Sequence, residues 1–461
     1  MHNNNLPEQV GLSGNLPEGE ADSSARRSFP GVSSVFMGSD VTSPSQEDGL
    51  LPGVGESFVR WLGEGILSGK PVGALSGLTD ILFFLSFTVC YSWGFINTTM
   101  FKKGFSDAFE LRMEGLLHFA VLNVLVCGII ALLLQNSLQQ AVFELVLLAA
   151  GFCHWKFGAG KYEYFVMCVL IVGMTGRSFK MLLSIAFTIG SAIMAAAFVA
   201  SQLGIITDLV YEGGRHSFGI IYCTDCAAHF LYLMVIYVFL RLDSLRIVEY
   251  VSLILALALM LLTKAQSDIV CGALLLAGIL VFRLTRRWHK SGFVRITASI
   301  ASFSFIIFAI VSFAGTLGFN RNDLELRKKI PYSLIRRLEM NQEALGAHPF
   351  PVFGSTIEEH GFGGRTENLP GWDKYFFLDC SYIRLYIIGG VLLFIMILLV
   401  MTYAQLRCFA YRRYDLLFLL VLIAFSCVME HHIMEYYYNV FPLMAFSGRR
   451  LFREDPIPGT G

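Results

Sequence analysis

The chain has 461 residues, of which 55% are hydrophobic and 15% are charged, and its mean hydropathy is +0.60. This composition lies well outside the range of soluble proteins. The 35 basic and 35 acidic residues cancel, and a formal net charge of +0 gives no indication of nucleic acid or of an acidic partner. The ten cysteines are scattered, mostly inside apolar runs where cysteine is usually a small buried hydrophobe, so we expect no disulfide framework.

Residues 1–74 are rich in Gly, Ser, Pro, Asn and acidic residues and show little periodic hydrophobicity. Such a composition buries too little apolar surface to offset the entropy of ordering, which predicts a disordered cytoplasmic tail. No basic stretch followed by an apolar core is present, so the tail is not a signal peptide. The short amphipathic piece 58–67 is a candidate for lying on a membrane surface.

Apolar segments follow one another from residue 75 to residue 450. A helix needs roughly 17–25 residues to cross a bilayer, and several of the segments are shorter, which leaves ten to twelve crossings. We therefore expect an all-α polytopic membrane protein with about 12 transmembrane helices and a short cytoplasmic tail at 451–461. The expected spans are 77–97, 115–135, 139–154, 162–177, 181–202, 218–240, 247–263, 266–282, 295–315, 379–403, 416–430 and 433–447.

A long polar segment, residues 316–378, separates two of these apolar runs. Backbone in lipid must satisfy its own hydrogen bonds, so a loop of this length has to lie in water at one membrane face. Counting the spans places the basic clusters of the short connections on one side of the membrane. The positive-inside rule assigns that side to the cytoplasm. The loop is then extracytoplasmic, although Lys102, Lys103 and Arg112 would also lie on that side.

Two basic residues stand near the outer ends of the predicted spans. Arg215 lies where the sixth span begins, and its guanidinium suits a phosphate or pyrophosphate. The alternative is an interfacial arginine that reaches toward lipid headgroups. Lys264 lies in a polar turn that also holds Asp268; the two would meet each other, contact a substrate, or simply be solvated.

A second group of polar residues lies within the sixth span. Asp225 and His229 are four residues apart and share a helical face, and ionisable residues inside membranes usually mark a functional path. Cys223, Cys226 and His229 have a spacing seen in metal sites, but the sequence offers no fourth ligand. We therefore expect no metal there.

The polar loop and the C-terminal part hold further candidates. Arg336 and Arg337 form a basic pair on an expected helical turn, and His348 opens a proline-stiffened extended segment. Asp379 begins the next span, either as a general base for a sugar hydroxyl or as a helix cap. Glu430–Glu435 contains a His-to-Glu spacing seen in zinc proteases, but no matching second site, so a polar cap on the outer end of the bundle fits better.

Four of these pieces, in this order, resemble the Gram-positive members of the Wzy-type polysaccharide polymerases, which are relatives of the O-antigen ligases. The likeness covers roughly residues 75–450. It departs from the usual family pattern within Thr263–Asp268, where the family shows "Thr-x-Ser-Arg", because this chain lacks that arginine and has Lys264 nearby. The pieces are Gly204–Asp208 with Arg215–Gly219, then Thr263–Asp268, then Arg337-Leu338 with Phe353-Gly354 and Asp379–Tyr382, and last Glu430–Asn439.

The resemblance implies a glycosyltransferase at the outer face of the bacterial cytoplasmic membrane that uses neither metal nor other cofactor. It would join undecaprenyl-pyrophosphate-linked oligosaccharide repeat units into a capsule or other surface polysaccharide. The implied partners are the lipid-linked oligosaccharide, membrane lipid, and the flippase and chain-length regulator of the same pathway. The implied residues are Arg215, Arg337 and Asp379 for catalysis, and Lys264, Arg336, His348, Tyr382 and Glu430 for binding substrate.

Other functions remain open on the sequence alone. An O-antigen-ligase-like enzyme would have the same scaffold, but ligases usually carry a histidine where this chain has Asp379. A flippase or transporter of lipid-linked oligosaccharides is the next alternative, although no internal repeat of the kind that many transporters show is visible. A purely structural membrane protein is disfavoured by the many ionisable residues beside the spans.

Overall fold

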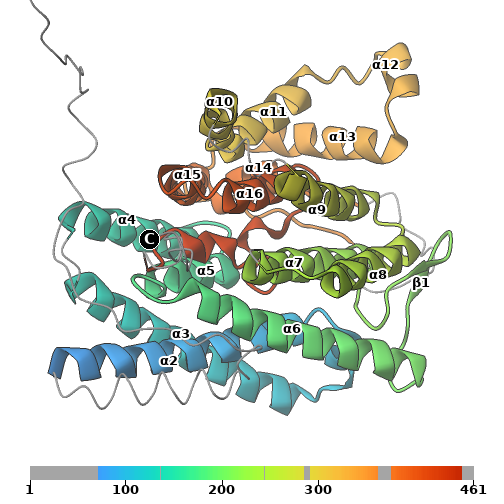
Figure 1. The fold of residues 1–461 in the computed structure, drawn as a ribbon. Helices are drawn as coiled ribbons and strands as arrows, with labels where there is room; N and C mark the ends of the chain where they lie inside the picture. The colour runs from blue at the N-terminus through green and yellow to red at the C-terminus, as the bar shows by residue number, and fades with distance from the viewer. Residues whose placement is uncertain (1–70, 135–136, 243, 285–290, 362–374, 449–461) are drawn as a thin grey trace, which may run out of the picture. The chain divides into compact units, whose positions relative to one another are not determined.

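A computed structural model describes residues 71–134, 137–242, 244–284, 291–361 and 375–448, all of which belong to one structural unit. Helices make up nearly all the regular structure of these residues (Figure 1). A two-stranded antiparallel hairpin, β1 (Val210–Tyr211) with β2 (Arg215–His216), is the sheet found among them. Most of the predicted N-terminal tail, its segment 58–67 and the C-terminal tail lie outside the described residues.

The described part of the chain contains seven helices that are long and apolar enough to cross a membrane, or up to eight if a bent pair counts as one crossing. The all-α membrane class is thus confirmed. The expected number of about twelve transmembrane helices is approached only if helices shorter than a full crossing are counted as well. The seven are α2 (Pro71–Ile96), α3 (Asp107–Leu134), α4 (Leu138–Phe157), α6 (Phe179–Gln202), α7 (Cys223–Arg241), α9 (Gln266–Leu284) and α15 (Val391–Ala410).

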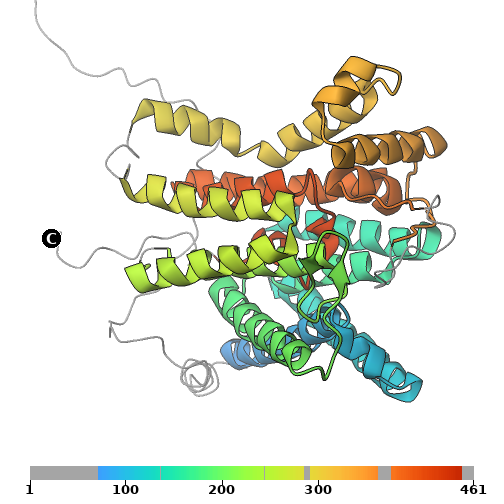
Figure 2. The same cartoon turned by 90° about the vertical axis from the view of Figure 1, so that its right-hand side faces the viewer.

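Five further apolar helices, two of which form a bent pair, account for other long apolar segments. The pair α10 (Gly292–Ala301) and α11 (Ser304–Gly318) is bent by 57° (Figure 2). The helices α5 (Tyr162–Gly173), α8 (Ile247–Thr263) and α16 (Tyr414–Ser426) are shorter than a full crossing. Large apolar side chains on the outer faces are strongly exposed, for example Leu133 at 80% and Ile247 at 82%, which suits a surface that faces lipid.

The prediction of a helical span at 433–447 is wrong. This segment is irregular, with 3-10 turns at η5 (His432–Met434) and η6 (Phe441–Met444). Pro442 lacks a backbone N–H, and the Asn439 carboxamide accepts a hydrogen bond from the Phe441 N–H at 3.2 Å, which competes with helical bonding. Surrounding helices bury the segment, and irregular backbone is tolerated at membrane depth where protein encloses it.

A column of aromatic rings runs along the buried face of α2. Phe83, Phe87, Tyr91 and Phe95 recur every four residues along α2 and are at most 1% exposed, because this spacing places them on one helical face. Successive ring centroids lie 6.5, 5.6 and 5.9 Å apart. Lipid tails are as apolar as these side chains, so close packing rather than removal from water holds the helices together.

The polar loop folds back on the bundle through two helices, α12 (Leu324–Lys329) and α13 (Tyr332–Ala347). Pro331 precedes α13, which is longer than the helical turn predicted from the sequence. Gln342 donates to the Thr316 and Phe319 carbonyls at 2.7 and 2.6 Å and thereby ties α13 to the end of α11. Figure 1 shows α11, α12 and α13 together beside the bundle.

The extended segment after α13 is anchored where two helices meet. The turn α14 (Ser381–Arg384) runs into a π-helical stretch, η4 (Leu385–Gly389), which ends before α15. At this break the Val391 N–H donates to the Pro351 carbonyl at 2.9 Å, and the Ser355 N–H donates to the Ile387 carbonyl at 2.9 Å. Gly354 and Gly390 touch here with φ of 99° and 87°, in the region that favours glycine.

We expect Gly354→Ala to destabilise the protein. A Cβ at this position would lie 1.9 Å from the Ile388 carbonyl oxygen, and the positive φ adds strain. The expected loss is about 2 kcal/mol or more, seen as a lower midpoint of thermal unfolding in detergent. Gly346→Ala is the matched control, because nothing lies within 4 Å of a Cβ on this glycine of α13 and alanine favours helix. Equal midpoints for the two variants would contradict the anchoring.

Candidate functional site

Arg337 and Asp379 form the centre of the candidate site. The Arg337 Nε donates to the Asp379 Oδ2 at 2.7 Å, and the two side chains are 24% and 17% exposed. Burial alone would lower the pKa of Arg337, but Asp379 and Glu430 outweigh it and raise that pKa above its usual value. The described hydrogen bond of the Asp379 carboxylate goes to Arg337 rather than to the start of α14, so the structure favours an ion pair over a helix cap.

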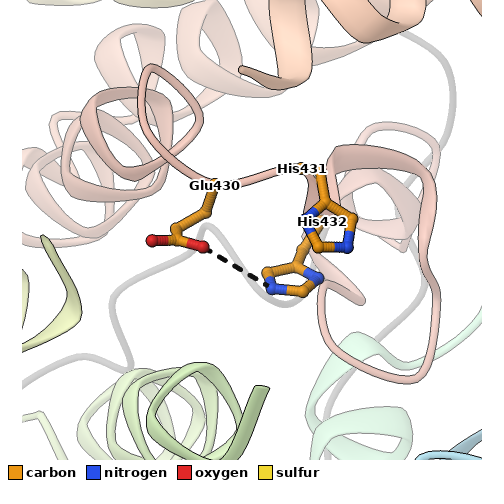
Figure 3. Close-up of side chains that lie close together, drawn as sticks. All are labelled: Glu430, His431 and His432. Atoms are coloured by element: carbon orange, nitrogen blue, oxygen red, sulfur yellow. Dashed lines mark ion pairs between the residues drawn. The ribbon is translucent and has the colours of Figure 1, made fainter. Parts of the chain in front are cut away.

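Glu430 lies beside this pair, just after the end of α16. It is 3% exposed and accepts a hydrogen bond from the Ser267 hydroxyl at the start of α9. Its Oε2 is 4.0 Å from the His432 Nε2 (Figure 3). Burial raises the pKa of Glu430, although Arg337 and His432 oppose the shift. A carboxylate with a raised pKa is a stronger base when it is deprotonated.

His432 is held by a second carboxylate. Its Nδ1 is 2.7 Å from the Glu435 Oε2, and its side chain is fully buried. Burial lowers the pKa of His432, but the contact with Glu435 outweighs burial and raises it. The His431 Nε2 is 3.5 Å from the Glu435 Oε1, and burial brings the pKa of His431 well below its usual value. The pKa values of the two neighbouring histidines are therefore shifted in opposite directions.

The raised pKa of His432 predicts a pH-dependent stability. A histidine whose folded pKa is raised stabilises the fold fully below its unfolded pKa, and this contribution is lost as pH rises through the folded pKa. We expect the difference in unfolding midpoint between wild type and His432→Asn to shrink as pH rises from about 6.5. Thermal unfolding in detergent over a pH series measures it, and His431→Asn serves as the control. A pH-independent difference would show that the pKa of His432 is the same in the folded and unfolded states.

Glu430, His431 and His432 are also the group of described residues placed to share a metal ion, with ligand atoms within 4.8 Å of one another (Figure 3). The contact of Glu435 with the His432 Nδ1 is of the type that orients metal-bound histidines. The Cys223, Cys226 and His229 spacing does not build such a group in the described structure. His229 is instead stacked between two aromatic rings and contacts the Thr98 hydroxyl at 2.8 Å.

Arg215 and Lys264 come together at the β hairpin. Gly213 and Gly214, with φ of 78° and 70°, make the turn that precedes β2. The Arg215 Nε donates to the Thr263 carbonyl at 3.1 Å, and the Lys264 Nζ donates to the Gly213 carbonyl at 2.5 Å. The hairpin and the end of α8 thus carry two cations side by side.

Asp268 does not join the Lys264 turn. It is 1% exposed in the first turn of α9, and neither carboxylate oxygen has a hydrogen-bond partner among the described residues. Its carboxylate interacts electrostatically with Glu430, Asp225 and Arg337. The buried cluster around Glu430 therefore holds more carboxylates than the sequence reasoning placed there.

Three tyrosines connect the β hairpin with Arg337. Tyr211 of β1 stacks on Tyr222 with ring centroids 6.3 Å apart. Tyr375 interacts electrostatically with both Tyr222 and Arg337. The structure gives no direct contact between Arg215 and Arg337, so a ligand that engaged both would have to bridge this group.

Three other predicted residues lie away from the Arg337 pair. Arg336 contacts the Glu339 carboxylate at 3.1 Å instead of Asp379. Burial would raise the pKa of Glu339, but Arg327 and Arg336 outweigh it and hold that pKa below its usual value. Tyr382 is 0% exposed and donates to the Ala424 carbonyl at 2.8 Å within the core. His348 lines a cavity of about 270 Å³ at the end of α13.

Two features escaped the sequence reasoning. Glu359 of the loop contacts Lys161 at 3.0 Å and the buried Arg384, which fixes the loop to the start of α5 and to α14. A cavity of about 750 Å³ lies near the ends of α2 and α4 and is lined in part by Trp93 and Trp155. Aromatic residues at span ends are common at membrane interfaces, so their positions in the sequence carried no clear signal.

No protein-family model, curated protein or solved structure matches the chain. The chemistry is therefore argued from geometry. Cationic groups at Arg337 and at the β hairpin can stabilise a developing negative charge. The carboxylates of Asp379 and Glu430 can accept a proton.

Proposed function

We propose that this protein is a glycosyltransferase of the polysaccharide-polymerase type. It joins undecaprenyl-pyrophosphate-linked oligosaccharide repeat units at the outer face of the bacterial cytoplasmic membrane. The observation that carries the proposal is the partly buried Arg337–Asp379 pair beside Glu430, at an end of an apolar helical bundle. The bundle accommodates a lipid tail, and the pair and Glu430 offer the cation and the bases that glycosyl transfer requires.

In the proposed reaction, an acceptor hydroxyl oxygen bonds to the anomeric carbon of the donor sugar. The bond from that carbon to the pyrophosphate oxygen breaks, and the lipid pyrophosphate leaves with the electron pair. Asp379 or Glu430 takes the hydroxyl proton, while Arg337 stabilises the charge that develops on the pyrophosphate. Arg215 and Lys264 supply a second cationic group for the same leaving group.

A ligase that moves finished chains to another acceptor is the second candidate function. O-antigen ligases usually carry a histidine where this chain has Asp379, but His432 lies 4.0 Å from Glu430 in the same cluster. His432 therefore lies close to the carboxylate that would take part in the proton transfer. The two functions differ in acceptor rather than in scaffold.

Cells that lack the gene test the proposal, through gels of surface and lipid-linked glycans. A single repeat unit that accumulates outside, with no ladder, is the expected result. A complete ladder left on the lipid carrier would show a ligase instead. Repeat units trapped on the cytoplasmic side would show a flippase and overturn the proposal.

Metal removal is a separate prediction. We expect chain extension in purified membranes to continue at the original rate after dialysis against EDTA, because the proposed roles use charged side chains rather than an ion. Radiolabelled chain length on gels is the measurement. Loss of extension after dialysis, restored by Zn²⁺ or Mn²⁺, would instead assign an ion to the group of Glu430, His431 and His432.

A further inference from the structure

The cavity of about 750 Å³ is lined by the end of α2, the beginning of α3, the α4–α5 connection and the chain after α16. This volume falls within the range of about 300–1,000 Å³ that is usual for small-molecule sites. Neither Arg337, Asp379 nor Glu430 lines it. It is therefore a second site, beside the one described above.

Aromatic side chains form much of the cavity wall. The rings of Trp155 and Tyr162 lie 5.1 Å apart. Tyr437 enters because residue 94 is a glycine: a Cβ there would lie 2.5 Å from the Tyr437 ring. Such faces suit the apolar C–H surface of a sugar ring, and they are supplied by three segments that are distant in sequence.

The polar groups of the cavity carry both signs of charge. Lys102 and Lys161 line it together with Glu114 and Glu163. Neither glutamate has an ion-pair partner among the described residues, whereas Lys161 is engaged by Glu359 at 3.0 Å. The carboxamide oxygen of Asn97, which also belongs to the lining, is buried without a hydrogen-bond partner in the described structure.

These groups favour one ligand chemistry. Free carboxylates and an amide oxygen accept hydrogen bonds, so they call for a ligand with several hydroxyl donors. A phosphate or lipid headgroup anion gains little here, because Glu114 and Glu163 offset the attraction of Lys102 and Lys161. Aromatic walls with hydroxyl-binding polar groups fit a neutral carbohydrate.

We infer that this cavity binds a neutral sugar of the acceptor glycan. The inference rests on the proposed function, which it deepens by giving the acceptor its own site. Tyr436 and Tyr437 line the cavity, while Glu430 and His432 of the same segment lie in the buried cluster. Glu163 of the cavity also interacts electrostatically with Glu435, which holds His432. One short segment thus separates the acceptor site from the Arg337 site.

Sugar binding by the purified full-length chain in detergent tests the inference. The probes are glucose, galactose, N-acetylglucosamine and glucuronic acid, followed by saturation-transfer NMR and by tryptophan fluorescence. We expect at least one neutral sugar to bind, and glucuronic acid to bind more weakly. Glu163→Gln and Trp155→Ala should each weaken binding by about tenfold or more, because a site built for hydroxyl groups then loses a partner or a wall.

Matched controls separate the possible outcomes. Glu110→Gln, one turn earlier on α3 than Glu114 and outside the lining, should bind as wild type. Arg337→Ala should also bind, even where chain extension is lost, so failure of the proposed function and failure of the cavity are distinguishable. If Trp155→Ala does not fold, Lys102→Ala is tested in its place, because Lys102 lines the cavity at an exposed position. Absence of binding by every neutral sugar, or binding unchanged by Glu163→Gln, would overturn the inference.

Discussion

Arg337→Ala is expected to reduce chain extension by about 10²–10³-fold, the usual effect of removing one group that stabilises transition-state charge. Arg337 is the partly buried cation beside Asp379, at 2.7 Å, and its charge is also felt by Glu430. Arg337→Lys should recover only part of the rate, because an ammonium lacks the planar fork of a guanidinium. The measurement is the extension rate of lipid-linked repeat units in membranes, normalised to the amount of folded protein.

The neighbouring arginine provides the matched control. Arg336 is 44% exposed and pairs with Glu339 at 3.1 Å on the outer side of α13. An exposed ion pair contributes little, so Arg336→Ala should leave both rate and stability nearly unchanged. Equal losses from the two substitutions would mean that the net charge of α13, rather than the Arg337–Asp379 pair, supports the reaction.

The two arginines also show where sequence reasoning stops. Hydropathy alone located the polar loop and its basic pair, because a long charged segment between apolar runs is visible without any structure. Adjacent residues on a helix point about 100° apart, so at most one of the two could face Asp379. Which one depends on how α13 is tied to α11 through Gln342, a tertiary contact that leaves no local pattern.

The last apolar segment illustrates a different limit. Its apolar residues at 433–447 are numerous enough to resemble a span, yet Asn439 and Pro442 turn the backbone away from a helix. Because this irregular segment is buried, Glu430 and His432 lie in the buried cluster next to Arg337, whereas Tyr437 lines the aromatic cavity. Helical periodicity cannot predict contacts of this kind, since the partners lie hundreds of residues apart.

The second large effect is expected from replacing the general base. Asp379 was the first candidate from the sequence, but its Oδ2 is engaged by Arg337. Glu430 is more deeply buried, and burial raises its pKa. We therefore expect Glu430→Gln to lower the turnover number by about 10²–10⁴-fold, the usual contribution of a general base. Because glutamine keeps the shape of glutamate and can still accept from Ser267, the fold should be retained.

The pH profile and the Asp379→Asn variant decide between the two carboxylates. A general base works only when deprotonated, so wild-type turnover should fall as pH drops through the raised pKa of Glu430, and Glu430→Gln should lose this limb. Asp379→Asn leaves Arg337 without its anion and should mainly raise KM, because donor positioning suffers while the base remains. If Asp379→Asn instead removes the acid limb and Glu430→Gln keeps it, the proton goes to Asp379. The proton would then go to Oδ1 of Asp379, because Oδ2 holds the Arg337 guanidinium.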